Sequence, residues 1–218
     1  MNQLMQSQYN KDFYTPDEIK ELGFASVGNN VLLSRYARIY GASNISIGSN
    51  VRIDDFVILS GKIEIGNFVH IGASSNITGS DIGVNIKDFC GISNHVRILA
   101  ISDDYSGETL SNPCIPLEYK KIQKHHIILE KHCIVGSGSV ILPNAYLAEG
   151  VAIGSMSMVI RKTNPWGIYF GIPAKRIKER NNKLLKLEKT FLEQFEISQG
   201  GGGKLASIFI PSSSRLSA

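Results

Sequence analysis

The sequence predicts an all-β protein that folds for most of its length as a parallel β-helix, with short strands stacked coil upon coil. Aliphatic residues recur every six positions over long stretches, and glycine, asparagine or aspartate recurs beside them at the same interval. A helix with about 3.6 residues per turn cannot hold this pattern, and a strand period of two leaves the regular turn residues unexplained. A coil with flat sides and tight corners satisfies both observations.

The aliphatic positions form phased runs that are separated by short slips and by one long interruption. Small or β-branched residues such as Val51 and Ser139 follow four places after most of them. Stacked coils would pair their strands in parallel and bury these side chains between neighbouring coils. The runs are Val27, Leu33 and Ile39, then Ile47, Ile53, Leu59, Ile65, Ile71 and Ile77, then Ile86, Ile92 and Ile98, and finally Leu129, Val135, Ile141, Leu147, Ile153 and Val159.

A short N-terminal helical segment is predicted before the repeat, within residues 1–26. Thr15 can cap a helix that begins at Pro16, and Glu18 completes a capping box. Gly23 can end this helix in the left-handed conformation.

The β-helix is predicted to occupy residues 27–176, and a C-terminal amphipathic helix is predicted at 177–196. Leu184, Leu187, Phe191 and Phe195 have the spacing of one helical face. The tail at 197–218 contains Gly and Ser runs without a sustained period, so we interpret it as disordered.

Composition favours a globular protein that acts on a small molecule. The chain has 218 residues, 43% of them hydrophobic, and a net charge of +4, which suits an anionic ligand. No Lys/Arg run indicates nucleic acid, and the three cysteines show no CxxC pattern. The N-terminus lacks a signal-peptide pattern and no apolar run has membrane length, so we expect a cytoplasmic protein without membrane insertion.

The repeat is interrupted in "RILAISDDYSGETLSNP", which begins at Arg97. It stops at Asp103 and resumes near Leu129, so residues 103–126 are predicted to form an excursion loop. Because a β-helix core is scaffolding, we expect chemistry on this loop or on exposed corners.

The repeat and the closing block "VGSGSVILPNAYLAEGVAIGSMSMVIRKTNPWGIYFGIPAKRIKER" resemble the hexapeptide-repeat acyltransferases, over roughly residues 27–176. The resemblance implies a left-handed parallel β-helix of triangular section, a homotrimer with sites in its subunit clefts, and acetyl-CoA as acyl donor. The loop is similar to that of bacterial polysaccharide-cluster acetyltransferases. This implies transfer to a hydroxyl or amino group of a sugar, in surface polysaccharide or lipopolysaccharide synthesis.

Asp103 occupies a catalytic position in this resemblance. Sugar O-acetyltransferases of the family carry a histidine five places after the last aliphatic residue before the loop, which here is Ile98. An aspartate with a pKa of about 3.9 is a weak base for an alcohol, whereas an amine attacks with less help. O-transfer and N-transfer therefore both stay open, and His70 and His95 are the other candidates for a catalytic base.

Three residues are candidates for substrate binding. Asn76 lies in the region where the sugar O-acetyltransferases place a substrate-binding asparagine, Asp104 could bind sugar hydroxyls or an ammonium group, and Tyr105 could stack on a sugar ring. The alternative for Asp103 and Asp104 is that they only shape a turn.

The resemblance also implies a groove between coils that holds acetyl-CoA as an extended thread. Small residues would admit the pantetheine arm, and basic residues would meet the phosphates. The alternative is that the glycines only make turns and the basic residues only face solvent. The candidates are Gly136, Ser137, Gly154, Ser155, Lys162, Pro173, Ala174, Lys175 and Arg176.

No metal is predicted, because no pair of histidines has the spacing of a zinc site. Two other functions remain in view. One is antibiotic O-acetylation, which shares the fold and the donor, and the other is a non-catalytic β-helix that serves in binding or assembly.

Overall fold

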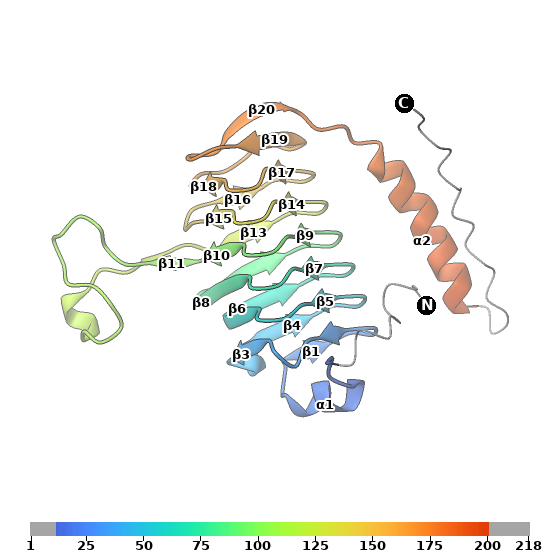
Figure 1. The fold of residues 1–218 in the computed structure, drawn as a ribbon, viewed down its shortest axis with the longest axis horizontal. Coiled ribbons are helices and arrows are strands. Elements are labelled where there is room, and N and C mark those ends of the chain that lie inside the picture. Colours follow the sequence, from blue (N-terminus) through green and yellow to red (C-terminus); the bar gives the residue numbers. More distant parts are fainter. Residues whose placement is uncertain (1–11, 201–218) are drawn as a thin grey trace, which may run out of the picture. The chain divides into compact units, whose positions relative to one another are not determined.

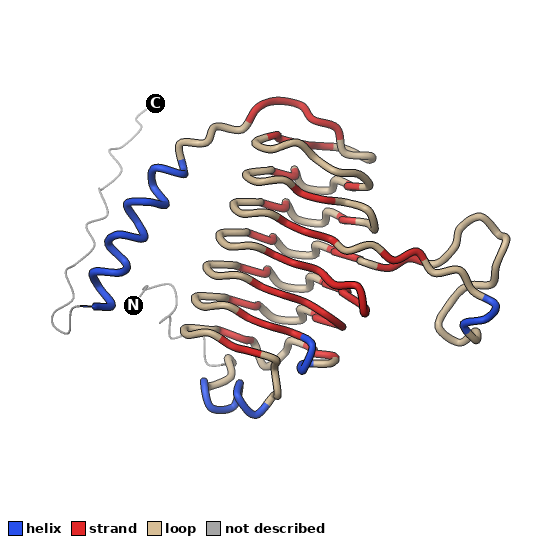
Figure 2. The backbone as a smooth tube through the Cα atoms, turned by 180° about the vertical axis from the view of Figure 1, so that it is seen from behind, coloured by secondary structure: helices blue, strands red, loops and turns tan. Residues whose placement is uncertain are grey.

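A stack of three-sided coils forms the first of two structural units, which divide after Arg180 (Figures 1 and 2). The computed structural model describes residues 12–200. Before the coils, α1 (Pro16–Glu21) carries the predicted capping box between Thr15 and Glu18. Gly23 follows α1 with a φ of +73°, as expected for a helix end.

We number the sides of each coil 1, 2 and 3 in chain order. Side 1 holds β1 (Ser26–Val27), β4 (Ile45–Ile47), the last residues of β6 (Ile58–Ile65) and β8 (Asn76–Ile86), β13 (Ile127–Leu129) and β16 (Tyr146–Leu147). Side 2 holds β2 (Leu32–Leu33), β5 (Arg52–Ile53), β7 (His70–Ile71), β9 (Gly91–Ile92), β14 (Ile134–Val135), β17 (Ala152–Ile153) and β19 (Gly167–Phe170). Side 3 holds β3 (Arg38–Tyr40), the first residues of β6 and β8, β10 (Arg97–Leu99), β15 (Val140–Ile141) and β18 (Met158–Val159).

Neighbouring coils pair in parallel, and the predicted aliphatic residues face one another in register. Ile53 pairs with Ile71, and Ile71 pairs with Ile92. All three are almost completely buried, as is most of the predicted series. The sequence-predicted β-helix and its core are therefore confirmed.

Corner 1/2, where each coil turns from side 1 to side 2, is built on left-handed residues. Asn30, Asn50, Phe68, Phe89, His132, Gly150 and Trp166 all have positive φ there. Left-handed backbone is unfavourable for most L-residues, so stacking must offset part of its cost. The Phe68 and Phe89 ring centroids are 4.9 Å apart, and those of Phe89 and His132 are 5.2 Å apart.

The three departures from the six-residue interval within the predicted aliphatic series fall at corner 3/1. The first is Gly41 with the short 3₁₀ helix η2 (Ala42–Asn44), and the second is an irregular stretch of β8 around Ser80. The third is the predicted loop at 103–126, which contains β12 (Gln123–Lys124) and η3 (Leu117–Tyr119). Extra residues are thus accommodated at one corner of the coil.

The C-terminal helix begins later than the predicted residue 177. Residues Lys175–Glu179 form β20, which pairs antiparallel with β19. Helix α2 spans Leu184–Gly200, so it also includes the start of the segment interpreted as a disordered tail. The rest of that tail and residues 1–11 lie outside the described residues. Within 12–200, no helix is long and apolar enough to cross a membrane.

Gly150 provides a test of corner 1/2. Its φ is +69°, and a Cβ added there would strike the ring of Trp166. Gly23 has a similar φ but open space around its Cα. We expect Gly23→Ala to cost about 1 kcal/mol from its backbone conformation, and Gly150→Ala to cost clearly more. Urea unfolding of both variants measures the difference, and equal losses would contradict the proposed packing of Trp166 over Gly150.

Candidate active site

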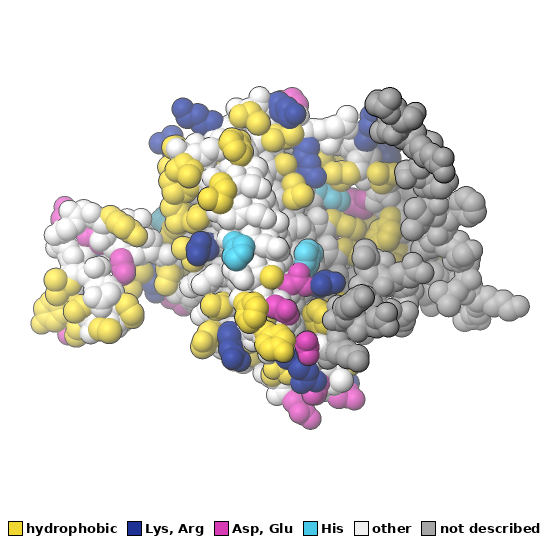
Figure 3. Space-filling model, viewed as in Figure 1, with side chains coloured by type: hydrophobic (Ala, Val, Ile, Leu, Met, Phe, Trp, Pro, Cys, Tyr) yellow, Lys and Arg dark blue, Asp and Glu magenta, His cyan; other side chains and the backbone are white. Residues whose placement is uncertain are grey.

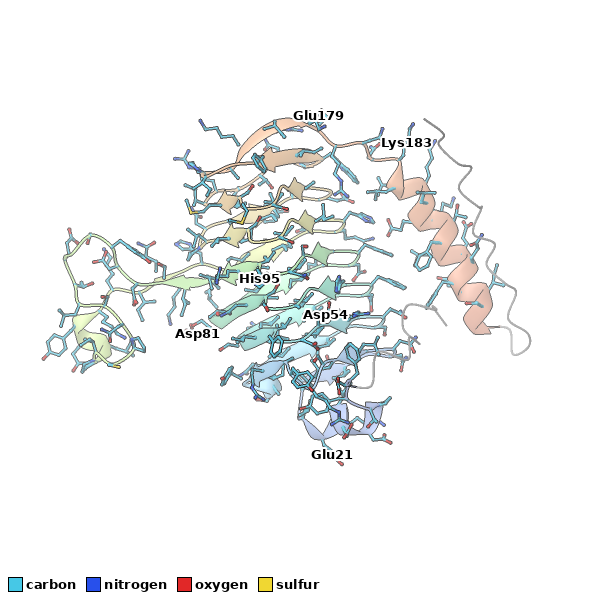
Figure 4. All side chains as sticks on the ribbon, viewed as in Figure 1. Glu21, Asp54, Asp81, His95, Glu179 and Lys183 are labelled. Carbon is cyan, nitrogen blue, oxygen red and sulfur yellow. The ribbon has the colours of Figure 1, made fainter. Side chains whose placement is uncertain are left out.

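The loop leaves the coil on an antiparallel ribbon made by β11 (Ile101–Ser102) and β12 (Figure 1). Lys124 on β12 donates to both carboxylate oxygens of Asp81 on β8, each at 2.9 Å. These bonds, followed by one from Ser80, lower the pKa of Asp81 to about 2. The ion pair connects the base of the ribbon to corner 3/1, where Asp81 is labelled in Figure 4.

Asp104 shapes the loop. Its carboxylate accepts hydrogen bonds from the backbone N–H and the hydroxyl of Ser106, at 2.9 and 2.8 Å, and from the Thr109 hydroxyl at 3.0 Å. The bonds from Ser106, and then that from Thr109, lower the pKa of Asp104. The oxygens of Asp104 are therefore already engaged in a turn, which is the alternative considered for it from the sequence.

Asp103 and Tyr105 flank Asp104 in different settings. Asp103 is half-buried where the ribbon opens into the loop, and one carboxylate oxygen accepts a weak 3.3 Å hydrogen bond from the Asn112 N–H. Its other oxygen accepts no hydrogen bond from the described residues. Tyr105 is 90% exposed, so its ring is presented to solvent. Of the three, Asp103 keeps the free acceptor that a catalytic or binding role needs.

A second set of polar side chains lies along side 2 and corner 2/3. His70 on β7 contacts Asp54 through Nε2 at 2.7 Å, and Arg52 donates to the other oxygen of Asp54 at 2.6 Å. Burial acts to raise the pKa of Asp54, but the bonds from His70 and Arg52 outweigh it and lower that pKa. Figure 3 shows histidine, acidic and basic side chains close together on this face.

Ser93 stands at corner 2/3, directly after β9, and the sequence reasoning did not select it. Its Oγ lies 2.7 Å from the Oγ of Ser137 on the next coil. The sequence signal that could have identified Ser93 is a change of residue type at the position directly after each strand of side 2. Gly72, Gly136 and Gly154 occupy this position in other coils. Ser34 and Asp54 stand at this position in the first two coils, and Ser93 is the polar side chain of the column in the coil that leads into the loop.

His95 and Asn76 lie near the same end of side 3 on neighbouring coils, because Asn76 pairs with Arg97. His95 is exposed at corner 2/3 with a φ of +60°, as labelled in Figure 4. Asn76 is half-buried on β8, and its amide oxygen accepts a 3.0 Å bond from the Thr78 hydroxyl. Within residues 12–200, no hydrogen bond links either residue to Asp103.

The glycines expected to line a cofactor groove have immediate packing roles. A Cβ on Gly136 would press against the Ser155 backbone, and one on Gly154 would strike the Phe170 ring. Close stacking of coils thus explains these glycines. Ser137 and Ser155 lie beside them at corner 2/3 and remain accessible.

The other cofactor candidates lie toward the end of the stack. Lys162 and Lys175 are exposed, whereas Arg176 donates to Glu179 at 2.7 Å and to the Pro165 carbonyl at 3.3 Å. Pro173 and Ala174 link β19 to β20, and the Ala174 N–H donates to the Met158 carbonyl. Lys162 and Lys175 are therefore better placed than Arg176 to meet an added phosphate. Among residues 12–200, no group of three or more His, Cys, Asp or Glu side chains could hold a metal ion.

The Asp54 carboxylate should make stability depend on pH in a defined direction. Its pKa is lower in the folded than in the unfolded chain, so its stabilisation is complete above the unfolded value of about 4 and is lost as pH falls through the folded value. We expect Asp54→Asn to lower the free energy of unfolding by about 1 kcal/mol at pH 7 and by less at pH 3.

Urea titrations of wild type and Asp54→Asn at both pH values measure this effect. Asp17→Asn is the matched control, because Asp17 is highly exposed and, within residues 12–200, its carboxylate pairs only with Lys20 on the surface. An Asp54→Asn deficit that stays the same at pH 3 would argue against an ionised, hydrogen-bonded Asp54.

Comparison with known proteins finds close relatives along most of the chain. It is 46% identical over 177 residues to the dTDP-4-amino-4,6-dideoxy-D-glucose acyltransferase of Escherichia coli, covering 80% of this chain and 92% of that protein. No protein-family model matches the chain.

Solved structures give the same relationship. AntD, an N-acyltransferase from Bacillus cereus solved with dTDP and 3-hydroxybutyryl-CoA, is 46% identical and superimposes with a TM-score of 0.84, covering 85% of this chain and 98% of AntD. A galactoside acetyltransferase in complex with coenzyme A, at 20% identity, has a TM-score of 0.54 and covers 83% of this chain and 80% of its own. This last likeness concerns the fold alone.

Proposed function

Since this chain belongs to the hexapeptide-repeat sugar acyltransferases, which use acyl-CoA as donor, we propose that it acylates the 4-amino group of dTDP-4-amino-4,6-dideoxyglucose. The observation that carries the proposal is the 46% identity to an acyltransferase of that nucleotide sugar, sustained over 92% of its length. We expect the enzyme to act in the cytoplasm, and the product would serve surface polysaccharide synthesis.

Asp103 supports an amine as the acceptor. In place of a histidine base, the loop presents a carboxylate with one oxygen free of described partners. Such a group is a poor base for an alcohol but a good acceptor for the N–H of an amine. We therefore propose that Asp103 holds the amino group, and that antibiotic O-acetylation and a purely structural role are less suited to the site.

The AntD variants support a second contact. AntD was solved as variants at a serine and at an aspartate that are ten positions apart, two of the serine variants with dTDP-4-amino-4,6-dideoxyglucose and coenzyme A. Ser93 and Asp103 have the same residue types and the same spacing. We propose that Ser93 contacts the acceptor amine together with Asp103.

The reaction then needs no covalent enzyme intermediate. The neutral amine attacks the thioester carbon, a C–N bond forms, and the C–S bond breaks. One proton leaves the nitrogen and ends on the thiolate of CoA. His70, fixed by Asp54, is the residue that we propose for accepting a proton from an ammonium form of the substrate, with His95 as the alternative.

The donor would lie along corner 2/3 and the end of the stack. We propose that Ser137 and Ser155 border the pantetheine arm, and that Lys162 and Lys175 meet the phosphates. AntD was solved with 3-hydroxybutyryl-CoA, so a hydroxyacyl donor is to be compared with acetyl-CoA.

A homotrimer would bring the two acceptor contacts together. Ser93 lies at corner 2/3, whereas Asp103 leaves from the far end of side 3, with all of β10 between them (Figure 1). The length of side 3 separates Ser93 from Asp103 by about 15 Å, whereas two groups that contact one amine must each lie within about 3.5 Å of it. We propose that each site combines Ser93 of one subunit with Asp103 of the next.

A thiol-release assay tests the acceptor. With acetyl-CoA or 3-hydroxybutyryl-CoA, we expect turnover with dTDP-4-amino-4,6-dideoxyglucose and none with dTDP-glucose, which has a hydroxyl in place of the amine. Asp103→Asn should lower kcat/KM by about tenfold or more, because a carboxylate accepts a hydrogen bond more strongly than an amide. Preferred acylation of hydroxyl acceptors would refute the proposal.

Mixing two impaired variants tests the shared site. Ser93→Ala and Asp103→Asn each impair every site in a pure trimer. In randomly mixed trimers, about a quarter of the sites would pair an intact Ser93 with an intact Asp103, so activity should rise toward that fraction. If both residues served the same subunit, unfolding and refolding the mixture would restore nothing.

A further inference from the structure

We infer that Ser137 is a positioning residue that directs the hydroxyl proton of Ser93 away from the acceptor amine. The two serines lie on adjacent coils at corner 2/3, and their Oγ atoms are 2.7 Å apart. The inference rests on the proposed N-acyl transfer and on the proposed contact between Ser93 and the amine. It gives Ser137 a role in addition to its place beside the donor.

Two other serines of this corner, Ser75 and Ser139, connect one coil to the next. The Ser75 hydroxyl donates to the Ser93 carbonyl, and the Ser139 hydroxyl donates to the Gly154 carbonyl. Both serines are fully buried. Each hydroxyl therefore satisfies a backbone group that water cannot reach, and the fold alone accounts for it.

Ser93 and Ser137 differ from these buried serines. Each is half-buried, and the hydroxyl of each bonds only to the other among the described residues. Their coils are already joined at this point by the Ser93 N–H, which donates to the Val135 carbonyl at 3.0 Å. The hydroxyl pair is therefore not needed to satisfy the backbone or to hold the coils together.

The hydrogen bond between the Ser93 and Ser137 hydroxyls can run in either of two directions. When Ser93 donates its proton to Ser137, a lone pair of Ser93 remains to accept an N–H from a bound amine. In the opposite direction Ser93 would donate to the lone pair of the amine nitrogen, and that lone pair must instead reach the thioester carbon. The 2.7 Å contact allows either hydroxyl to donate, and the direction in which Ser137 accepts is the one in which the amine stays nucleophilic.

The amine would be held by two acceptors during the reaction. Ser93 accepts one N–H and Asp103 accepts another, so the nitrogen lone pair is left facing the thioester. The C–N bond then forms, the C–S bond breaks, and the proton released from nitrogen reaches the CoA thiolate. Neither serine gains or loses a proton overall.

A double-mutant cycle tests the role of Ser137. We expect Ser137→Ala to lower kcat by about tenfold, with the KM values for acetyl-CoA and for dTDP-4-amino-4,6-dideoxyglucose and the melting temperature unchanged. Ser137→Thr keeps the hydroxyl and should restore kcat. In the Ser93→Ala background, Ser137→Ala should have no further effect, because it acts through Ser93. Ser49→Ala removes a corner hydroxyl far along the stack, one that accepts from the Asn29 N–H, and should leave kcat unchanged.

Three results would overturn the inference in distinguishable ways. Losses that add in the double variant, or a raised KM for acetyl-CoA, would make Ser137 a donor-binding residue only. A fully active Ser93→Ala enzyme would remove the contact through which Ser137 acts, while leaving N-acyl transfer intact. A wild-type enzyme that acylates no amino sugar would instead refute the proposed function.

Discussion

Parallel pairing of each coil with the next is the constraint on which the rest of the structure depends. Ile53, Ile71 and Ile92 pair in succession, so equivalent residues repeat at the strand spacing of about 4.8 Å. Neighbouring side chains on the surface therefore come from equivalent positions of successive coils rather than from one segment of sequence. Ser93 and Ser137 are 44 positions apart in the chain, yet this pairing brings their hydroxyls into contact.

The same constraint decides where the coil can vary. Corner 1/2 stacks its aromatic rings from coil to coil, so an added residue there would break a continuous column. Corner 3/1 absorbs the three departures from the six-residue interval within the aliphatic series, because the strands on either side regain register after it. The excursion loop is the longest of these departures, and the pair between Lys124 and Asp81 holds its base against the coil. Variation in the length of the coil is in this way confined to one edge of the scaffold.

Periodicity made the coil, its core and the position of the loop predictable, because each depends on residues close in sequence. Contacts between coils were not predictable in the same way: Asp54 meets His70 across 16 positions, and Ser93 meets Ser137 across a loop. The turn-forming role of Asp104 stayed one of two alternatives at the level of sequence, because it depends on hydrogen bonds from the Ser106 and Thr109 hydroxyls that form only in the folded loop. Residues 177–179, the end of β20, were assigned to a helix because the antiparallel partner of that strand, β19, lies outside the segment.

The separation of polar groups between two corners has a consequence for the chemistry. A hydroxyl acceptor needs a base beside it at the moment of attack, whereas an amine needs acceptors that orient its hydrogens. A site for an amine therefore needs hydrogen-bond acceptors but no base beside the nucleophile. These acceptors can come from different chains: a half-buried carboxylate at the base of a loop and a hydroxyl on a rigid corner. The carboxylate in place of the usual histidine thus fits an amine acceptor, and the distance between Asp103 and Ser93 in one subunit fits a site completed by its neighbour.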